Sequence, residues 1–234
     1  MASSGKKARR SIDKVPSNPI ESQIKINGFE PIVARNYPQA AYLESLRRNQ
    51  ITFAVGPAGT GKSYIATAYA AEQLYYKKVD KIVITRPAVE AEESLGFLPG
   101  ELEEKYAPYL APIRDIFDNL LGKSFVDYCL KTKYIEPVPI AFMRGRTFEN
   151  AIVLVDEAQN CTPNQMKLIL SRIGENCQYV IDGDITQKDI NGQSGLEDSI
   201  RRLEHIPGIE VITFLNQDIV RSGLCKKIIQ AYSE

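Results

Sequence analysis

Residues 56–63 have the types and the spacing that hold a phosphate. They read GPAGTGKS and fit the pattern G-x-x-x-x-G-K-[ST]. In such a loop the glycines let backbone N–H groups turn toward the phosphates, and the following helix adds its positive dipole end. Lys62 can reach a phosphate, and the hydroxyl of Ser63 can ligate Mg²⁺. A glycine-rich turn is the alternative, but the apolar run 51–55 and the Gly- and Pro-free run 63–76 supply the strand and the helix that a phosphate-binding loop requires.

Two carboxylates form a second candidate site. Asp156 and Glu157 directly follow the apolar run 151–155. In P-loop NTPases an Asp at the end of such a strand holds Mg²⁺, and the adjacent Glu polarises the attacking water. Alone, the pair would indicate a solvated turn or a helix cap. Together with the phosphate-binding loop, it predicts the second half of a nucleotide site.

A third polar segment follows another apolar run. Residues 178–182 read QYVID, and residues 183–187 read GDITQ. Open α/β sheets bind their ligands at the carboxyl ends of the strands. Gln187 is therefore a candidate sensor of the γ-phosphate or of the attacking water, with a simple turn at Gly183-Asp184 as the alternative.

A predicted helix precedes the first strand. Residues 38–48 carry apolar side chains at helical spacing and lead into the strand that begins at residue 51. Tyr37 and Gln39 lie at the start of this helix, where a nucleotide base could stack on the ring and be read by the amide. A packed aromatic at an ordinary helix start fits the sequence equally well.

The alternation of strands and helices predicts the fold. Strands are expected at 51–55, 81–85, 151–155, 178–182 and 209–214. Because long connections separate them, we expect a parallel sheet covered by helices on both faces, which is a three-layer α/β/α architecture. Residues 134–140 are predicted to be extended, since prolines recur there at alternate positions.

The domain organisation follows from the same pattern. Residues 1–20 form a basic tail, whose charge could be solubilising or could bind nucleic acid. Residues 21–234 form one domain with a helical insertion at about 88–130. Within the insertion we expect helix breaks at Pro108 and Pro112, and a final helix is expected at 219–232.

Composition narrows the classes of function. The chain has 234 residues and 44% apolar content, enough for one large core, and its 29 basic and 29 acidic residues balance. A nucleic-acid site would therefore have to be a local patch. Four scattered cysteines and a single histidine, His205, argue against a zinc site or a Ser-His-Asp triad. No run has the length of a membrane span or the layout of a signal peptide, so we expect a cytoplasmic protein with no membrane partner.

Several separated motifs carry a resemblance to a known family. In chain order they are GPAGTGKS, ITRPAVEAEESLGFLPGELEEKYAPYLAPI, FMRGRTFENAIVLVDEAQN, LSRIG, GDITQKDI and DIVRSGL. Together they resemble the PhoH-like, phosphate-starvation-inducible ATPases, over about residues 37–232. The core of that family is similar to the first motor domain of superfamily 1 helicases. The resemblance implies a RecA-like P-loop NTPase with a central, mainly parallel, five-stranded sheet.

The resemblance also implies roles for the matched residues. Ser63 and Asp156 would hold Mg²⁺, and Glu157 would act as the base that activates water. Lys62 and Gln187 would complete the catalytic set, with Gln187 sensing the phosphate, and Gln39 would read the adenine. The triphosphate of ATP would lie on Gly56, Pro57, Ala58, Gly59, Thr60, Gly61, Lys62 and Ser63.

Two positions depart from the family pattern. Ser63 stands where Thr is common, and either hydroxyl can ligate Mg²⁺. Asp182 stands where the family often has Thr. An additional carboxylate near the phosphates could alter metal binding or the rate of hydrolysis.

The chain has a single motor-like domain, whereas a monomeric helicase binds ATP between two. The resemblance therefore implies a homo-oligomer, a hexamer in this family, in which a neighbouring subunit supplies an arginine worth roughly 10³ to 10⁵ in rate. The candidates are Arg221, Arg144, Arg146 and Arg172, each of which could instead form a surface salt bridge. Arg86, Arg144 and Arg146 could alternatively face a nucleic-acid backbone.

These inferences lead to one hypothesis and two alternatives. The hypothesis is a Mg²⁺-dependent ATPase that couples hydrolysis to movement on, or unwinding of, single-stranded RNA or DNA. The first alternative is a small-molecule kinase, which Glu157 beside Asp156 fits less well than it fits water activation. The second is a nucleotide-gated scaffold, in which ATP controls assembly and turnover is incidental.

Overall fold

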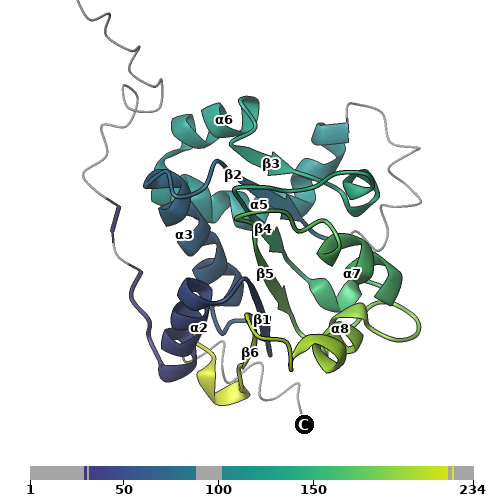
Figure 1. Cartoon of the computed structure of the whole chain (residues 1–234). Helices are drawn as coiled ribbons and strands as arrows, with labels where there is room; N and C mark the ends of the chain where they lie inside the picture. The colour runs from purple at the N-terminus through teal and green to yellow at the C-terminus, as the bar shows by residue number, and fades with distance from the viewer. Residues whose placement is uncertain (1–28, 31, 88–101, 221–222, 224–234) are drawn as a thin grey trace, which may run out of the picture.

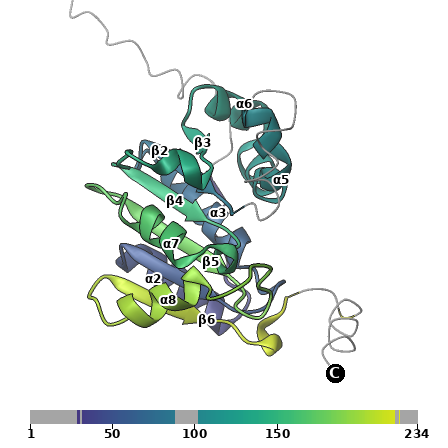
Figure 2. The ribbon, with the colours of Figure 1, turned by 90° about the vertical axis from the view of Figure 1, so that its right-hand side faces the viewer.

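The computed structural model describes residues 29–30, 32–87, 102–220 and 223. Within these residues a six-stranded sheet has the order β3-β2-β4-β5-β1-β6, and every neighbouring pair is parallel. Figure 2 shows the strands side by side. Their bounds are Ile51–Val55 (β1), Lys81–Thr85 (β2), Ile135–Pro137 (β3), Ala151–Val155 (β4), Gln178–Gly183 (β5) and Ile209–Thr213 (β6).

Helices cover both faces of the sheet (Figure 1). Helices α2 and α3 lie on one face, α7 and α8 lie on the other, and α5 and α6 pack at the end of the sheet formed by β2 and β3 (Figure 2). The three-layer α/β/α fold is therefore confirmed. The bounds are Tyr37–Arg48 (α2), Lys62–Tyr75 (α3), Leu102–Leu121 (α5), Lys123–Lys131 (α6), Pro163–Leu170 (α7) and Gly195–Leu203 (α8), with 3₁₀ turns at Ile140–Met143, Ala158–Asn160 and Asn216–Asp218.

The strands owe their apolar character to burial on both faces. Ala54 of β1 faces the core under α2 and α3, whereas Phe53 and Val55 face the core under α7 and α8. The same alternation holds for Leu154 and Val153 of β4. Since both faces are covered, every residue of β1 and β4 is buried, which explains their continuous apolar runs.

The prediction of five strands is wrong by one short edge strand. Residues 134–140 were expected to be extended, and β3 forms within them, paired with β2 alone. Pro137 lacks a backbone N–H, and β3 tolerates this because, within the residues that the structure describes, it is an edge strand with one unpaired side. The Val138 N–H then donates to the Ile84 carbonyl at 2.8 Å.

The expected helix breaks at Pro108 and Pro112 are also wrong. Helix α5 runs through both prolines. Its buried side chains recur at intervals of three or four residues, and they are Tyr106, Leu110, Ile113, Phe117 and Leu121. This apolar stripe packs against α3 and α6 and offsets the hydrogen bonds that the prolines remove.

Some predictions fall on residues that the structure does not describe. These are the basic tail 1–20, the first part of the insertion at 88–101 and nearly all of the expected helix at 219–232, including Arg221. The division into a tail and one domain with an insertion therefore stays a prediction. In the described part of the chain, no helix has the length and apolar character needed to cross a bilayer.

Candidate nucleotide-binding site

Glycines shape the loop between β1 and α3. Gly56 has φ of +141°, and a Cβ there would lie 2.2 Å from the carbonyl oxygen of Phe214. Gly61 has φ of +91°, and a Cβ there would lie 2.8 Å from Nε2 of Gln39. Both positions combine a positive φ with a close approach, so no other residue fits without displacing its neighbours.

Lys62 is held against the carbonyls of its own loop. Its Nζ donates to the carbonyl oxygens of Gly56 at 2.6 Å and of Pro57 at 2.9 Å. The side chain is largely buried, and this burial lowers the pKa of its ammonium group, an effect opposed by nearby carboxylates, of which Asp182 is the strongest. The structure thus places the lysine inside the loop, where a phosphate would replace carbonyl partners.

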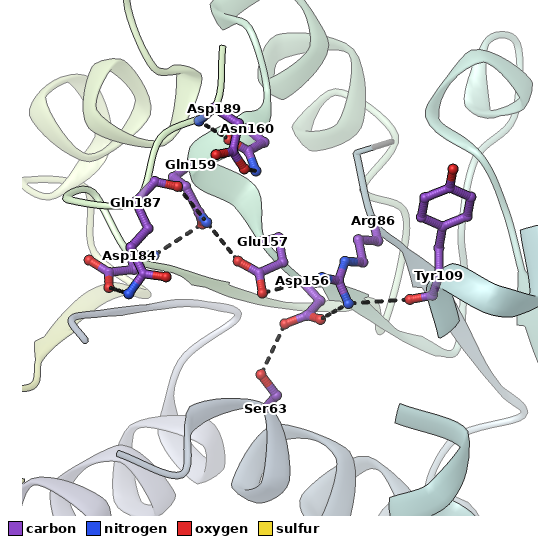
Figure 3. Close-up of polar contacts among 10 residues, drawn as sticks. All are labelled: Ser63, Arg86, Tyr109, Asp156, Glu157, Gln159, Asn160, Asp184, Gln187 and Asp189. Carbon is purple, nitrogen blue, oxygen red and sulfur yellow. Dashed lines mark hydrogen bonds and ion pairs between the residues drawn. The ribbon is translucent and has the colours of Figure 1, made fainter. Parts of the chain in front are cut away.

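Ser63 and Asp156 meet as predicted. Ser63 lies in the first turn of α3 and Asp156 follows β4, and the Ser63 Oγ donates to the Asp156 Oδ1 at 2.9 Å (Figure 3). Burial raises the pKa of Asp156, the charge of Glu157 adds to this, and Arg86 and the Ser63 hydrogen bond oppose it.

This pair of oxygens suits Mg²⁺, which prefers one or two protein ligands and takes the rest from phosphates and water. Among the residues that the structure describes, no three His, Cys, Asp or Glu side chains cluster as a metal site. The geometry therefore fits a metal that is bound together with a nucleotide.

Glu157 occupies a strained backbone position beside Asp156. Its φ of +53° is left-handed, which costs a residue with a side chain of this kind about 1–3 kcal/mol. Its Oε2 accepts from Nε2 of Gln159 at 2.6 Å, and its Oε1 lies 3.4 Å from Nη2 of Arg86. With 39% of its side chain exposed, the carboxylate is accessible to water while it is anchored on both oxygens.

Gln159 connects the two polar segments, and sequence reasoning missed it. Its side chain is buried, and its Nε2 donates to Glu157 and to the Gln187 carbonyl, the latter at 3.3 Å. Its Oε1 accepts from the Asp184 N–H at 3.0 Å. Its place in the run DEAQ was the one signal that could have pointed to it, because the sequence does not tell a buried amide from an exposed one.

Gln187 lines the same cavity as the carboxylates, and its role as a sensor stays a prediction. Its Nε2 donates to the Asp184 Oδ2 at 2.8 Å (Figure 3). The other Asp184 oxygen accepts from the N–H and the hydroxyl of Thr186. Further along the two segments, Asn160 and Asp189 form two hydrogen bonds with each other, of 2.9 and 2.8 Å. The segment that follows β5 is thus tied to the segment that follows β4.

Asp182 lies beneath the loop and is almost completely buried. Its Oδ1 accepts from the Tyr42 hydroxyl at 2.6 Å. Burial raises the pKa of Asp182 to about 7, against the opposing effect of the Tyr42 hydrogen bond. The departure from the family pattern therefore places a titratable carboxyl next to the phosphate site.

Gln39 and Tyr37 differ in their surroundings. Gln39 is buried, and its Nε2 donates to the Thr60 carbonyl at 2.8 Å, while its Oε1 accepts from the Arg35 N–H at 2.8 Å. It therefore supports the loop from below, and reading an adenine would require these bonds to be exchanged. Tyr37 is 84% exposed, so its ring is available for stacking.

The predicted arginines lie in several places. Arg86 ends next to the carboxylates, with Nη1 3.5 Å from the Asp156 Oδ2 (Figure 3). Arg146 donates to Glu136 at 2.8 Å and lies over the ring of Phe148. Arg144 is exposed. Arg172 donates to the carbonyl oxygen of Arg146 at 3.4 Å, Arg221 is outside the described residues, and the roles given to all five stay predictions.

A cavity of about 260 Å³ joins these groups. The loop and the first turn of α3 form one wall, and the carboxylates of Asp156, Glu157, Asp182 and Asp184 with Gln187 form the other. One basic side chain, Lys62, thus shares the cavity with acidic and amide side chains that could hold a metal and a water.

Comparison with known proteins assigns the chain. The family model described as PhoH-like protein matches residues 31–233. The chain belongs to this family. The resemblance drawn from the motifs is therefore confirmed, and this PhoH-like chain has the P-loop nucleotide-binding fold of its family.

Curated relatives carry the same name. Protein PhoH of Escherichia coli strain K12 is 48% identical over 207 residues, which cover 87% of this chain and 58% of that protein. A PhoH-like protein of Bacillus subtilis strain 168 is 45% identical over 198 residues, covering 84% of this chain and 62% of that protein. A PhoH-like protein of Mycobacterium leprae strain TN is 40% identical over 221 residues, covering 94% and 63%. The chain thus spans about three-fifths of the length of these relatives.

Proposed function

We propose that this PhoH-like chain is a Mg²⁺-dependent ATP hydrolase. It couples hydrolysis to the binding of single-stranded nucleic acid and to movement on it, with RNA as the preferred substrate and DNA as the alternative. One observation carries the hydrolase: the Ser63 hydroxyl lies 2.9 Å from Asp156, with the accessible carboxylate of Glu157 beside it. A hydroxyl, a metal-binding carboxylate and a second carboxylate in this arrangement are the parts of a water-activating phosphate site.

Each residue has a chemical task in this proposal. Ser63 and Asp156 would hold Mg²⁺, which neutralises phosphate charge when it is bound. Lys62 would exchange its loop carbonyls for phosphate oxygens. Glu157 would accept a proton from the attacking water, and Gln159 keeps that carboxylate oriented with its 2.6 Å hydrogen bond.

Hydrolysis is favoured over transfer to a metabolite because Glu157 is open to water. A kinase needs an acceptor pocket beside the terminal phosphate and basic groups to close it. Within the described residues, Lys62 is the only Lys or Arg that lines the cavity.

The same observation supports a homo-oligomer. A cation that stabilises the transferring phosphate is worth roughly 10³ to 10⁵ in rate, and Lys62 alone among the described cavity residues carries a positive charge. We propose that a neighbouring copy, in a ring such as a hexamer, supplies Arg221, Arg144, Arg146 or Arg172. Exposed Arg144 and the neighbouring Arg146 are also the proposed contacts to a nucleic-acid backbone.

Phosphate release tests the hydrolase. Wild-type protein should release phosphate from ATP only with Mg²⁺, and Lys62→Ala and Glu157→Gln should each lower the rate by about 100-fold or more. Glu157→Gln should still bind ATP. Lys167→Ala on the exposed face of α7 and Glu175→Gln before the start of β5 are matched controls that should keep the wild-type rate.

Different results would point to other functions. A phosphorylated small molecule in place of free phosphate would indicate a kinase, and assembly that persists in Glu157→Gln with full biological function would indicate a scaffold.

The nucleic-acid part is tested by adding single-stranded RNA or DNA at several salt concentrations, because phosphate contacts weaken as salt rises. If neither polymer binds nor changes the rate, that part is wrong. The mass of the assembly in solution tests the ring.

A further inference from the structure

We propose that Arg86 is a positioning residue that acts as the counter-cation of the nucleotide-free site and competes with Mg²⁺ for Asp156. The proposal deepens the proposed function and rests on it, because it treats Asp156 as a metal ligand. The ion pairs of Arg86 join the end of β2 to the end of β4, and the sequence motifs did not predict them.

The guanidinium divides its nitrogens between two carboxylates. Nη1 lies 3.5 Å from the Asp156 Oδ2, and Nη2 lies 3.4 Å from the Glu157 Oε1. The other oxygen of Asp156 is the one that accepts from Ser63. The Asp156 carboxylate therefore has a hydroxyl on one side and a cation on the other (Figure 3).

Two adjacent carboxylates need a positive charge when no metal is present. The side chain of Asp156 is only 10% exposed, so solvent screens its charge weakly, whereas that of Arg86 is 25% exposed. Both contacts are long for hydrogen bonds, so the guanidinium is held loosely and can withdraw. Because a dication and a guanidinium on one carboxylate repel each other, binding of Mg²⁺ must weaken the contact of Arg86.

Helix α5 holds the backbone of Arg86 in place. The hydroxyl of Tyr106 accepts from the Arg86 N–H at 2.6 Å and donates to the Arg86 carbonyl at 2.8 Å. The carbonyl of Tyr109 accepts from Nη1 at 3.3 Å. Since Tyr106 is buried in the core under α5, a shift of this helix would move Arg86 relative to the carboxylates.

Metal-dependent nucleotide binding tests the competition. A fluorescent ADP analogue is titrated with Mg²⁺ on wild type and on Arg86→Gln, and the variant should reach half-saturation at about one-tenth of the Mg²⁺ concentration. Arg86→Lys, which can reach one carboxylate but not both, should lie between them. Tyr106→Phe keeps the ring and removes the hydroxyl, so it should shift the midpoint in the same direction by a smaller factor.

Thermal unfolding supplies a readout that does not depend on turnover. Without Mg²⁺ and nucleotide, Arg86→Gln should melt several degrees below wild type, since Asp156 and Glu157 then repel each other without a cation. With both present, the difference should shrink. Arg201→Gln is the matched control, because Arg201 pairs with Asp198 on α8 at 2.6 Å, away from the site.

The outcomes separate this inference from the proposed hydrolase. An unchanged or higher Mg²⁺ midpoint in Arg86→Gln overturns the inference, as does a loss of melting temperature that is equal with and without the ligands. Wild-type protein that binds the Mg²⁺–nucleotide complex but releases no phosphate refutes the hydrolase and leaves the competition measurable.

Discussion

The two walls of the cavity are built in different ways. The loop wall depends on backbone geometry, since Gly56 and Gly61 adopt positive φ angles where a side chain would collide. The carboxylate wall depends on side chains that hold each other, with Arg86 and Gln159 on either side of Glu157. The loop wall is therefore fixed by its backbone, whereas a ligand can rearrange the carboxylate wall by replacing the partners of its side chains.

The largest effect is expected from a substitution that disrupts the loop wall. Gly56→Ala adds a Cβ that would lie 2.2 Å from the Phe214 carbonyl oxygen at a positive φ, so we expect a loss of about 3–5 kcal/mol in unfolding free energy and no detectable nucleotide binding. Gly208→Ala is the control, because Gly208 has φ of +86° but nothing within 4 Å of a Cβ. It should cost only about 1–2 kcal/mol. Urea unfolding measures both, and equal losses would mean that the collision is relieved elsewhere.

The same difference explains what could be predicted from the sequence. The strand ends, the loop and the position of Asp156 beside Ser63 follow from apolar runs and from one motif with a fixed backbone geometry. The edge strand β3 was missed because its pairing depends on β2, which is distant in the chain, and the prolines masked it. Helix α5 passes through Pro108 and Pro112 because packing outweighs local propensity.

The side-chain network could not be predicted in the same way. The sequence makes Arg86 a candidate contact to a nucleic-acid backbone, because a charge at a strand end fits either partner. Only the order of β2 beside β4 places its side chain next to the carboxylates. Gln159 was not singled out at all. Its role depends on partners that lie far away in the chain, because Asp184 and Gln187 both come from the segment at the end of β5.

An intermediate effect is expected from a substitution in the carboxylate wall. Gln159→Ala removes the donor to Glu157 and the acceptor for the Asp184 N–H, so the base loses its orientation. We expect kcat to fall by about 10- to 100-fold, as for other groups that orient an active residue, with KM for ATP nearly unchanged because the loop is untouched. Steady-state kinetics measures both. A rise in KM with normal kcat would show that Gln159 serves binding instead.

The last expected effect depends on pH and concerns the carboxyl of Asp182 beneath the loop. Burial raises the pKa of Asp182 to about 7, and a carboxyl whose pKa is higher in the folded chain stabilises the fold only while it is protonated. The contribution of Asp182 to stability should therefore decline as the pH rises from about 4 to about 7, by at most about 1.4 kcal/mol per pH unit. The groups facing Asp182 are Tyr42 from α2, Lys62 from α3, and Asp156 and Glu157 after β4.

Asp182→Asn isolates this contribution. The Asn side chain can still accept from the Tyr42 hydroxyl, but it does not titrate. The melting temperature of the variant relative to wild type should therefore be higher at pH 8 than at pH 5. A difference that is the same at both values would place the pKa of Asp182 in the ordinary range.

The strand order has a consequence for how the site comes into being. Strand β5 lies between β1, which carries the loop, and β4, which carries the carboxylates. The residues that meet in the cavity therefore range along the chain from Ala58 to Gln187. The loop and the carboxylates are thus neighbours across three strands of the sheet but lie far apart in the chain. Formation of the site therefore requires pairings between distant segments, which form late and slowly in folding. A bound nucleotide would stabilise the whole sheet through mass action, and nucleotide binding can serve as a measure of how many molecules have completed their fold.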